Sequence, residues 1–220
     1  MSAKININNY ALKLGEMLHN GLPGIAAQEI MAPSNRKELI VLNNHGKTAR
    51  TSSVLIILFP NEAGELCTIF TKRVEYKGVH SGQISFPGGK SEPEDKSLLH
   101  TALRETAEEI GLHINEKSIL GRLTDLFVPP SNFIISPFVA LLDAPPLMKP
   151  DPTEVAEIFS VPVLHCLAPE STIYQSYTTS FGQDIPVPGY LYRDYFIWGA
   201  TAMIYSELLW VIRQIECPVL

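Results

Sequence analysis

The chain has 220 residues, of which 45% are hydrophobic and 18% are charged, and this composition is typical of a folded domain. The net charge of −6 arises in residues 120–220, which hold 4 basic and 10 acidic side chains, because residues 1–119 hold 13 of each. The sequence has no long basic stripe and no apolar run of membrane length. We therefore expect neither a nucleic-acid partner nor a membrane partner.

The three cysteines are odd in number and widely spaced, so we expect free thiols and neither a disulfide framework nor a zinc site. The first ten residues contain no apolar block of signal-peptide length. A cytoplasmic location is therefore the expectation.

Periodicity and turn residues predict the elements in chain order. Residues 8–20 have the pattern of an amphipathic helix that ends at the Leu-Pro-Gly of residues 22–24. The β-rich runs Val54–Pro60 and Cys67–Arg73 are separated by a short polar turn, which is typical of a hairpin. Further elements are expected in the second half: a helix at Lys96–Ile110 stopped by Gly111, strands near 118–128, 134–142, 172–178 and 190–197, and a closing helix at 200–215.

Strands and helices alternate irregularly in this prediction, which indicates an α+β fold or a mixed-sheet α/β layer fold. The sequence shows no internal repeat and no low-complexity segment. We expect one globular unit over residues 51–220, with residues 1–50 forming an N-terminal helical extension packed on it.

The predicted helix Lys96–Ile110 places three carboxylates on one face. Glu105, Glu108 and Glu109 stand at i, i+3 and i+4, on a face distinct from the apolar one. Three carboxylates this close repel one another unless a cation lies among them, and oxygen ligands at this density suit Mg²⁺ or Mn²⁺. The alternative is a solvated acidic face on which Arg104 pairs with Glu108.

The neighbouring residues favour a metal site. Gly88 and Gly89 let the backbone approach a ligand closely, and Lys90 follows at once. A glycine-rich turn that leads into a carboxylate-bearing helix is a plausible site for a diphosphate and a metal.

The segment from Gly89 to Leu112 resembles the Nudix box, whose core is R-E-U-x-E-E-x-G-U with U a bulky aliphatic residue. The R-E-x-x-E-E-x-G part is matched in full from Arg104 onward, with Thr106 at the first U position. The usual pattern upstream is G-x5-E-x7-R-E. Here Asp95 replaces the first glutamate, and eight residues separate it from Arg104.

A second segment, residues 70–89, is similar to the one that marks coenzyme A pyrophosphatases within that family. That group typically has L-L-T-x-R-S followed by L-R-x-H-x-G-Q-V-A-F-P-G-G, and it shares the longer spacing and the aspartate. The chain differs at two places, where Val74 replaces the serine and Lys77-Gly78 replaces Leu-Arg. The resemblance covers residues 54–164 well.

The resemblance implies an α/β/α sandwich with a mixed sheet between helices. It implies hydrolysis of a nucleoside diphosphate linked to another group by Mg²⁺ or Mn²⁺ held by Glu105, Glu108 and Glu109, with the Gly89 carbonyl as a further ligand. Arg104 would orient the glutamates by ion pairing. One glutamate, most often the first in related enzymes, would accept the proton of the attacking water.

The narrower implication is cleavage of coenzyme A or acyl-coenzyme A to 4′-phosphopantetheine and adenosine 3′,5′-bisphosphate. One alternative keeps the chemistry and changes the substrate to ADP-ribose, a nucleotide sugar, a dinucleoside polyphosphate or an oxidised nucleotide. The other is a non-catalytic Nudix-fold module that senses a nucleotide. Many relatives are dimers, so a homodimer is a further expectation.

The region of residues 68–90 is locally basic, which suits a polyanionic small-molecule substrate. Arg73 is the first choice because its guanidinium fork can bind a phosphate bidentately. The candidate substrate-binding residues are Arg73, Lys72, Lys77, His80 and Lys90. Further downstream, Glu154 and Glu157 are candidates for a general base or an extra metal ligand, and the alternative is the start of a short acidic helix capped by Thr153 or Asp151.

Overall fold

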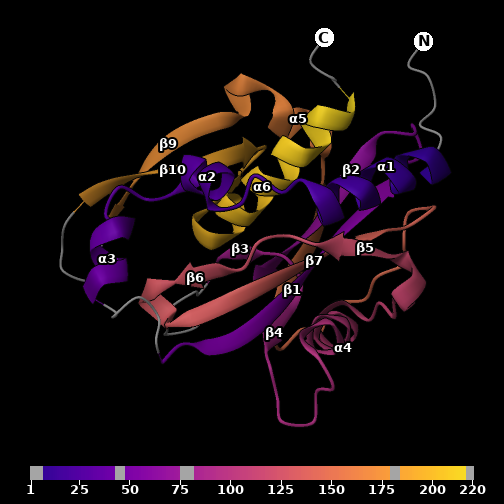
Figure 1. The fold of residues 1–220 in the computed structure, drawn as a ribbon, viewed down its shortest axis with the longest axis horizontal. Coiled ribbons are helices and arrows are strands. Elements are labelled where there is room, and N and C mark those ends of the chain that lie inside the picture. Colours follow the sequence, from indigo (N-terminus) through magenta and orange to yellow (C-terminus); the bar gives the residue numbers. More distant parts are fainter. Residues whose placement is uncertain (1–6, 43–47, 75–81, 179–183, 217–220) are drawn as a thin grey trace.

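The computed structural model describes residues 7–42, 48–74, 82–178 and 184–216 (Figure 1). Two of the predicted substrate-binding residues, Lys77 and His80, lie outside these ranges. No helix within the described ranges is long and apolar enough to cross a membrane.

The described strands form one mixed sheet and one smaller antiparallel sheet. The main sheet has the order β3-β2-β1-β7-β5, with β4 paired to β1, β6 to β7 and β8 to β2. Its members are β1 (Arg50–Pro60), β2 (Leu66–Arg73), β3 (Ile84–Ser85), β4 (Gly88–Lys90), β5 (Ile119–Arg122), β6 (Leu126–Val128), β7 (Phe133–Leu141) and β8 (Val155–Pro162). Strands β1 and β7 run parallel, and the other pairs are antiparallel.

Helices cover both faces of this sheet, as expected for an α/β/α sandwich (Figure 1). Helix α4 lies against one face, and α6, α1 and α2 lie over the other. The helices are α1 (Ile7–Asn20), α2 (Ile25–Gln28), α3 (Arg36–Leu42), α4 (Leu98–Ile110), α5 (Val163–Leu167) and α6 (Gly199–Glu216). Short 3₁₀ helices lie at Glu29–Met31, Glu116–Ser118, Pro129–Ser131 and Pro169–Ser171.

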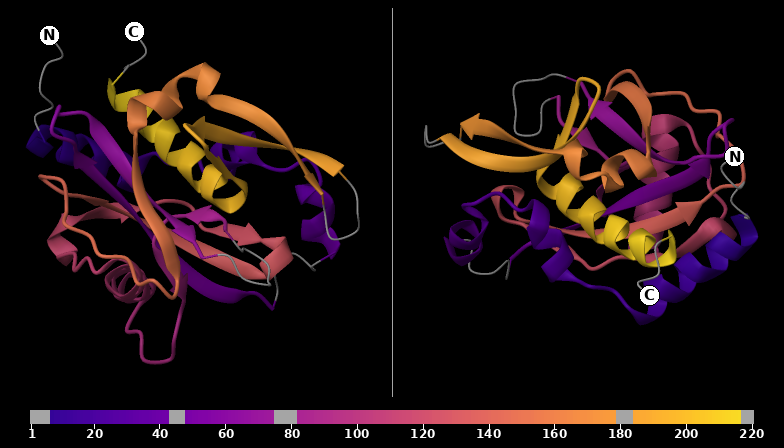
Figure 2. Two further views of the ribbon diagram at one scale, coloured as in Figure 1. Left: turned by 180° about the vertical axis from the view of Figure 1, so that it is seen from behind. Right: turned by 90° about the horizontal axis from the view of Figure 1, so that it is seen from above.

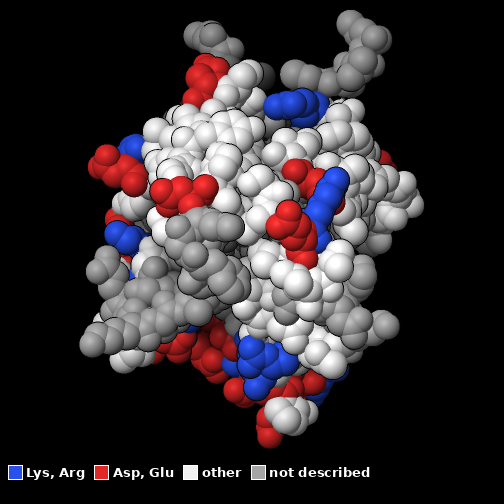
Figure 3. All heavy atoms as spheres, turned by 90° about the vertical axis from the view of Figure 1, so that its left-hand side faces the viewer, with Lys and Arg blue, Asp and Glu red and all other residues white. Residues whose placement is uncertain are grey.

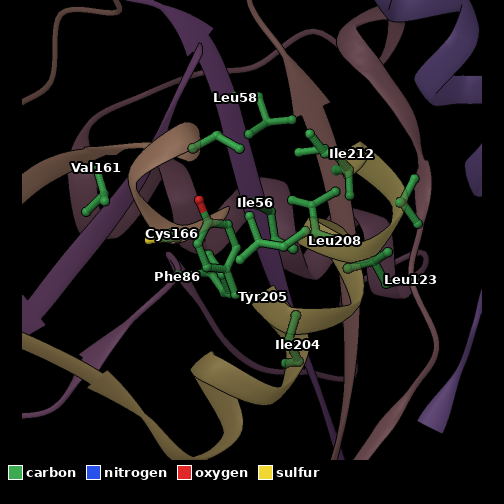
Figure 4. Packing of buried hydrophobic residues seen from close by; sticks show 14 of the residues in the cluster. Ile56, Leu58, Phe86, Leu123, Val161, Cys166, Ile204, Tyr205, Leu208 and Ile212 are labelled. Carbon is green, nitrogen blue, oxygen red and sulfur yellow. The ribbon is translucent and has the colours of Figure 1, made fainter. Parts of the chain in front are cut away.

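Strand β1 divides the core into two halves because its side chains alternate between the faces of the sheet. Leu55 and Ile57 belong to the cluster beneath α4, whereas Ile56 and Leu58 belong to the larger cluster beneath α6. All four are fully buried, and burial of each contributes about 1.5–3 kcal/mol. Figure 4 shows Ile56 and Leu58 facing α6, from which Tyr205 packs against Phe86.

The smaller sheet corrects one prediction. The expected single strand at 190–197 is wrong, because the chain turns at Arg193, whose φ is 53°. The sheet has the order β11-β10-β9, with β9 (Thr172–Thr178), β10 (Asp184–Tyr192) and β11 (Tyr195–Trp198), and it curves away beside α6 (Figure 2). Pro186 and Pro188 are tolerated in β10 because that part pairs only with β9, so no strand requires an N–H on the other side.

A second correction concerns the segment after Asp151. The acidic helix start considered for residues 151–157 is wrong. Asp151 accepts hydrogen bonds from the backbone N–H and hydroxyl of Thr153, which forms a tight turn, and β8 follows at once. Strand β8 pairs antiparallel with β2 over most of its length, so it extends the main sheet instead of starting a helix.

The N-terminal helices contribute to the larger core. Tyr10, Leu14 and Leu18 of α1 are buried in the same cluster as α6, and α2 also contacts α6. Gln28 is fully buried and donates a hydrogen bond of 2.8 Å to the carboxylate of Glu207 in α6. The boundary at residue 50 between extension and domain stays a prediction.

Candidate active site

Helix α4 has defined ends. Its first residue is Leu98, two residues later than predicted, because the Ser97 side chain caps the helix by accepting a hydrogen bond from the His100 N–H at 3.1 Å. Gly111 ends it in the left-handed conformation, with φ of 66°. These caps fix the register of the three glutamates.

Arg104 is the hub of the acidic cluster. Its Nε and Nη2 donate to the two carboxylate oxygens of Asp95 at 3.0 and 2.9 Å, and its Nη1 donates to Glu105 and Glu108 at 2.9 Å each. Nη2 also reaches the carbonyl oxygen of Lys90 at 3.2 Å. The Arg104 guanidinium holds the pKa of Asp95 well below its usual range. The buried Asp95 carboxylate therefore fixes Arg104, and Arg104 in turn orients Glu105 and Glu108, two of the predicted ligands.

Glu109 is the buried glutamate of the cluster, with 2% of its surface exposed. Its Oε2 accepts a hydrogen bond from the Gly88 N–H at 3.1 Å, and its Oε1 lies 3.6 Å from Nη1 of Arg73. Burial raises the pKa of Glu109 to about 7, although the bond from Gly88 and the charge of Arg73 oppose that effect. A positive charge nearby favours the ionised form of a carboxyl group in this position.

Glu105 packs directly against the glycine turn. A Cβ built on Gly89 would overlap the Glu105 carboxylate, lying 2.6 Å from Oε1 and closer still to the rest of the group. Burial raises the pKa of the Glu105 carboxyl, with the hydrogen bond from Arg104 opposing it. Because β4 pairs with β1 at Gly89↔Ser53, the backbone of Gly89 is fixed beside this carboxylate.

The loop after β7 brings a fifth carboxylate, that of Glu154, to the cluster. The Asp151 N–H donates to the carbonyl of Glu109 at the end of α4, at 2.9 Å, and thereby anchors the turn of residues 151–154. Glu154 then lies 3.9 Å from Nη2 of Arg73. Charges on Glu154 and Glu105 both act to raise the pKa of Glu109, so the three carboxylates share one electrostatic environment.

The remaining predicted site residues divide between the two faces of the sheet. On β2, Arg73 points toward Glu109, whereas Lys72 is registered opposite Glu157 of β8. Glu157 does not join the cluster at α4: it accepts a hydrogen bond from the hydroxyl of Tyr195 in β11 at 2.5 Å. The sequence placed Glu154 and Glu157 together at helical spacing, and a turn followed by a strand separates them.

Charged side chains of both signs gather along the lower edge of the face drawn in Figure 3, the side on which Figure 1 places α4 and β4. Much of the rest of that face is uncharged. Asp95 is the residue of this cluster to which the sequence assigned no role. Asp95 stands at the first acidic position of the Nudix-box pattern, which could have indicated its role. The change from glutamate to aspartate and the longer spacing made that match less clear.

The donor set fits a hard divalent cation. Glu105, Glu108 and Glu109 offer carboxylate oxygens, the ligands that Mg²⁺ and Mn²⁺ prefer, and Glu105 lies beside Gly89. Within the described ranges, no three His, Cys, Asp or Glu side chains already form a metal-sized cluster. In this structure, the positive charge beside the carboxylates comes from Arg104 and Arg73.

Comparisons with known proteins show the family of the chain. Residues 49–177 match the model of the NUDIX domain. An uncharacterized Nudix hydrolase, NudL, from Photorhabdus laumondii is 36% identical over 140 residues, covering 64% of this chain and 74% of that protein. The mitochondrial coenzyme A diphosphatase NUDT8 of Homo sapiens is 32% identical over 167 residues, covering 72% of this chain and 70% of that protein.

A solved structure shows the same fold. The MutT/nudix family protein from Enterococcus faecalis superposes with a TM-score of 0.51 at 20% identity, covering 76% of this chain and 62% of that one. The domain match spans more than half of the chain and includes the entire acidic cluster. The chain therefore belongs to the Nudix family and is a Nudix pyrophosphohydrolase, an enzyme class that acts on small-molecule nucleotides with divalent metal ions.

Proposed function

We propose that this enzyme hydrolyses the pyrophosphate bond of coenzyme A or acyl-coenzyme A with Mg²⁺ or Mn²⁺. The products would be 4′-phosphopantetheine and adenosine 3′,5′-bisphosphate. The 32% identity to a protein named as a coenzyme A diphosphatase, over 72% of this chain, supports the choice of substrate. The similarity of residues 70–89 to the coenzyme A pyrophosphatase segment also supports it.

One observation carries the chemical part of the proposal: the Arg73 guanidinium lies between Glu109 and Glu154, at the edge of the carboxylate cluster. A guanidinium fork can bind two phosphate oxygens at once. With carboxylates for a cation on one side and a phosphate-binding fork on the other, the site suits a metal-bound diphosphate. Lys90, whose carbonyl oxygen accepts a hydrogen bond from Arg104, is a further candidate for contact with the polyanionic substrate.

The residues of the cluster would divide the work. Glu105, Glu108, Glu109 and the Gly89 carbonyl would hold the cation, which when bound neutralises charge on the diphosphate. Arg104 sets the orientation of Glu105 and Glu108 through its paired bonds to Asp95. As an alternative to a role as ligand, Glu105, the first glutamate of the motif, would accept the proton of the attacking water.

Product analysis tests the proposal. The protein is incubated with coenzyme A and either Mg²⁺ or Mn²⁺, and adenosine 3′,5′-bisphosphate is the expected product. Dephospho-coenzyme A, which lacks the 3′-phosphate, should be cleaved more slowly. Cleavage of ADP-ribose or a nucleotide sugar but not coenzyme A would overturn the proposed substrate and leave the proposed pyrophosphate hydrolysis standing. Binding of these nucleotides without turnover would favour the sensing module.

A matched pair of variants tests the residues. Glu108→Gln removes one carboxylate at a position whose side chain is 57% exposed, so the fold should survive. We expect turnover to fall by at least about a hundredfold, as for loss of a group that orients or holds a metal. Glu116→Gln makes the same chemical change at an exposed position after α4 and should leave turnover unchanged.

A further inference from the structure

Arg73 and Arg104 contact the acidic cluster in different ways. Arg104 makes hydrogen bonds of 2.9–3.0 Å to its carboxylates, whereas the two contacts of Arg73 measure 3.6 Å to Glu109 and 3.9 Å to Glu154. Both Arg73 distances exceed the range of a hydrogen bond. Among the described residues, the Arg73 guanidinium therefore neutralises charge without committing its donors.

The two oxygens of Glu109 have different partners. Oε2 accepts the Gly88 N–H, which belongs to the fixed backbone of β4, while Oε1 faces only the side chain of Arg73 among the described residues. Among the described residues, Oε1 is the oxygen of Glu109 that accepts no backbone N–H, so we expect a divalent cation to bind there, where Arg73 lies. Two positive charges at one oxygen repel each other, so the cation and Arg73 compete for that position.

We propose that Arg73 is an exchangeable counter-ion that neutralises Glu109 and Glu154 before the cation binds and is released by it to grip the substrate's diphosphate. The inference rests on the proposed function, because it takes the acidic cluster as the cation site. The Arg73 side chain is 31% exposed at the end of β2, so it has room to turn. Cation binding thereby prepares the nucleotide site, and the two ligands bind with positive coupling.

The test measures two affinities without measuring turnover. Free Mn²⁺ is followed by electron paramagnetic resonance during titration of the wild-type protein, Arg73→Gln and Arg122→Gln. Removal of the competing charge should tighten Mn²⁺ binding about tenfold in Arg73→Gln, the scale of a hydrogen bond or ion contact to a charged group. Arg122 pairs with Asp125 at the same 3.6 Å on edge strand β5, so its variant controls for net charge and should bind Mn²⁺ as the wild type does.

The second affinity has the opposite expected sign. At saturating Mn²⁺, calorimetric titration with ADP as the probe should show binding about tenfold weaker in Arg73→Gln, because the phosphate-binding fork is gone. A merely structural role of Arg73 would weaken both affinities together. Arg73→Lys keeps the charge but cannot face two carboxylates at once, so its Mn²⁺ affinity should fall between those of the wild type and Arg73→Gln.

The outcomes separate the inference from the function on which it rests. Wild-type protein that binds Mn²⁺, with unchanged or weaker binding in Arg73→Gln, overturns the counter-ion role and leaves the proposed hydrolysis standing. Wild-type protein that binds no Mn²⁺ overturns both. Should Arg73→Gln melt at a much lower temperature than the wild type, Arg73→Lys decides, and an Mn²⁺ affinity equal to or below that of the wild type refutes the exchange.

Discussion

Replacing Gly89 with alanine separates catalysis from folding at one position. The new Cβ would lie 2.6 Å from Oε1 of Glu105, whereas an ordinary contact begins at 3.4 Å. The Glu105 carboxylate must then move by about 1 Å, and a misplacement of that size at a reacting centre lowers turnover by about a hundredfold. The obstructing atoms belong to the end of a flexible side chain, so the free energy of unfolding should change by less than about 1 kcal/mol.

Two other glycines supply the controls. At Gly88, with φ of 150°, a Cβ would lie 2.6 Å from Cα of Val54, so Gly88→Ala meets backbone and should lower the free energy of unfolding by more than about 2 kcal/mol. At Gly21 the nearest atom is 3.7 Å away, and alanine should be neutral. Turnover is measured with coenzyme A and Mn²⁺, and unfolding with urea. Full turnover in Gly89→Ala, or destabilisation equal to that of Gly88→Ala, would refute the placement of Glu105.

Three further predictions concern charge and metal. Asp95→Asn should lower the free energy of unfolding by about 2–3 kcal/mol at neutral pH. Because Arg104 holds the pKa of Asp95 below its usual value, this stabilisation is present above about pH 4 and is lost as the pH falls further. The unfolding free energies of wild type and variant should therefore converge in acid. Glu207→Ala leaves the buried Gln28 amide and the Thr124 hydroxyl without their shared acceptor and should cost about 2–4 kcal/mol in urea unfolding, whereas an unchanged midpoint would contradict the network. A chelator should abolish turnover and lower the melting temperature of protein prepared with Mn²⁺, and added Mn²⁺ should reverse both effects.

The elements that the sequence predicted correctly are those whose signal is local. Helix α4 combines apolar spacing, a capping serine and a terminal glycine, and all three lie within its own residues. The hairpin of β1 and β2 is marked by two apolar runs and the turn between them. Helix spacing alone was enough to place Glu105, Glu108 and Glu109 on one face. Arg104 also pairs with Glu108, as was expected under the alternative interpretation of a solvated acidic face.

The elements that the sequence missed depend on contacts between distant residues. Strand β8 forms because β2 offers an edge to it, and its acidic start at 154–157 gives no such signal. The prolines of β10 argued against a strand there, and they are tolerated only because β11 ends before it reaches them. The contact of Arg73 with Glu109 likewise joins residues from β2 and α4 that no motif pairs.

At Asp95 the chain departs from the sequence pattern both in residue type and in spacing. An aspartate carboxylate reaches about 1.5 Å less far than that of glutamate, and one additional residue adds about 3.3 Å of chain. The two differences occur together here, and the Asp95 carboxylate accepts hydrogen bonds from Nη2 and Nε, one edge of the Arg104 guanidinium, at 2.9 and 3.0 Å. It also accepts hydrogen bonds from the Glu92 N–H and the Thr101 hydroxyl, which fix the lengthened turn.

The position of Asp95 therefore affects two of the expected ligands, Glu105 and Glu108, through Arg104. Nη1 of Arg104 donates to Glu105 and Glu108 while the Asp95 carboxylate fixes Nε and Nη2 on the other side of the guanidinium. Arg73, by contrast, has no such anchor among the described residues and faces the carboxylates at longer range. In the proposed function, Arg104 therefore keeps its position at the carboxylates, whereas Arg73 is the arginine that the cation releases.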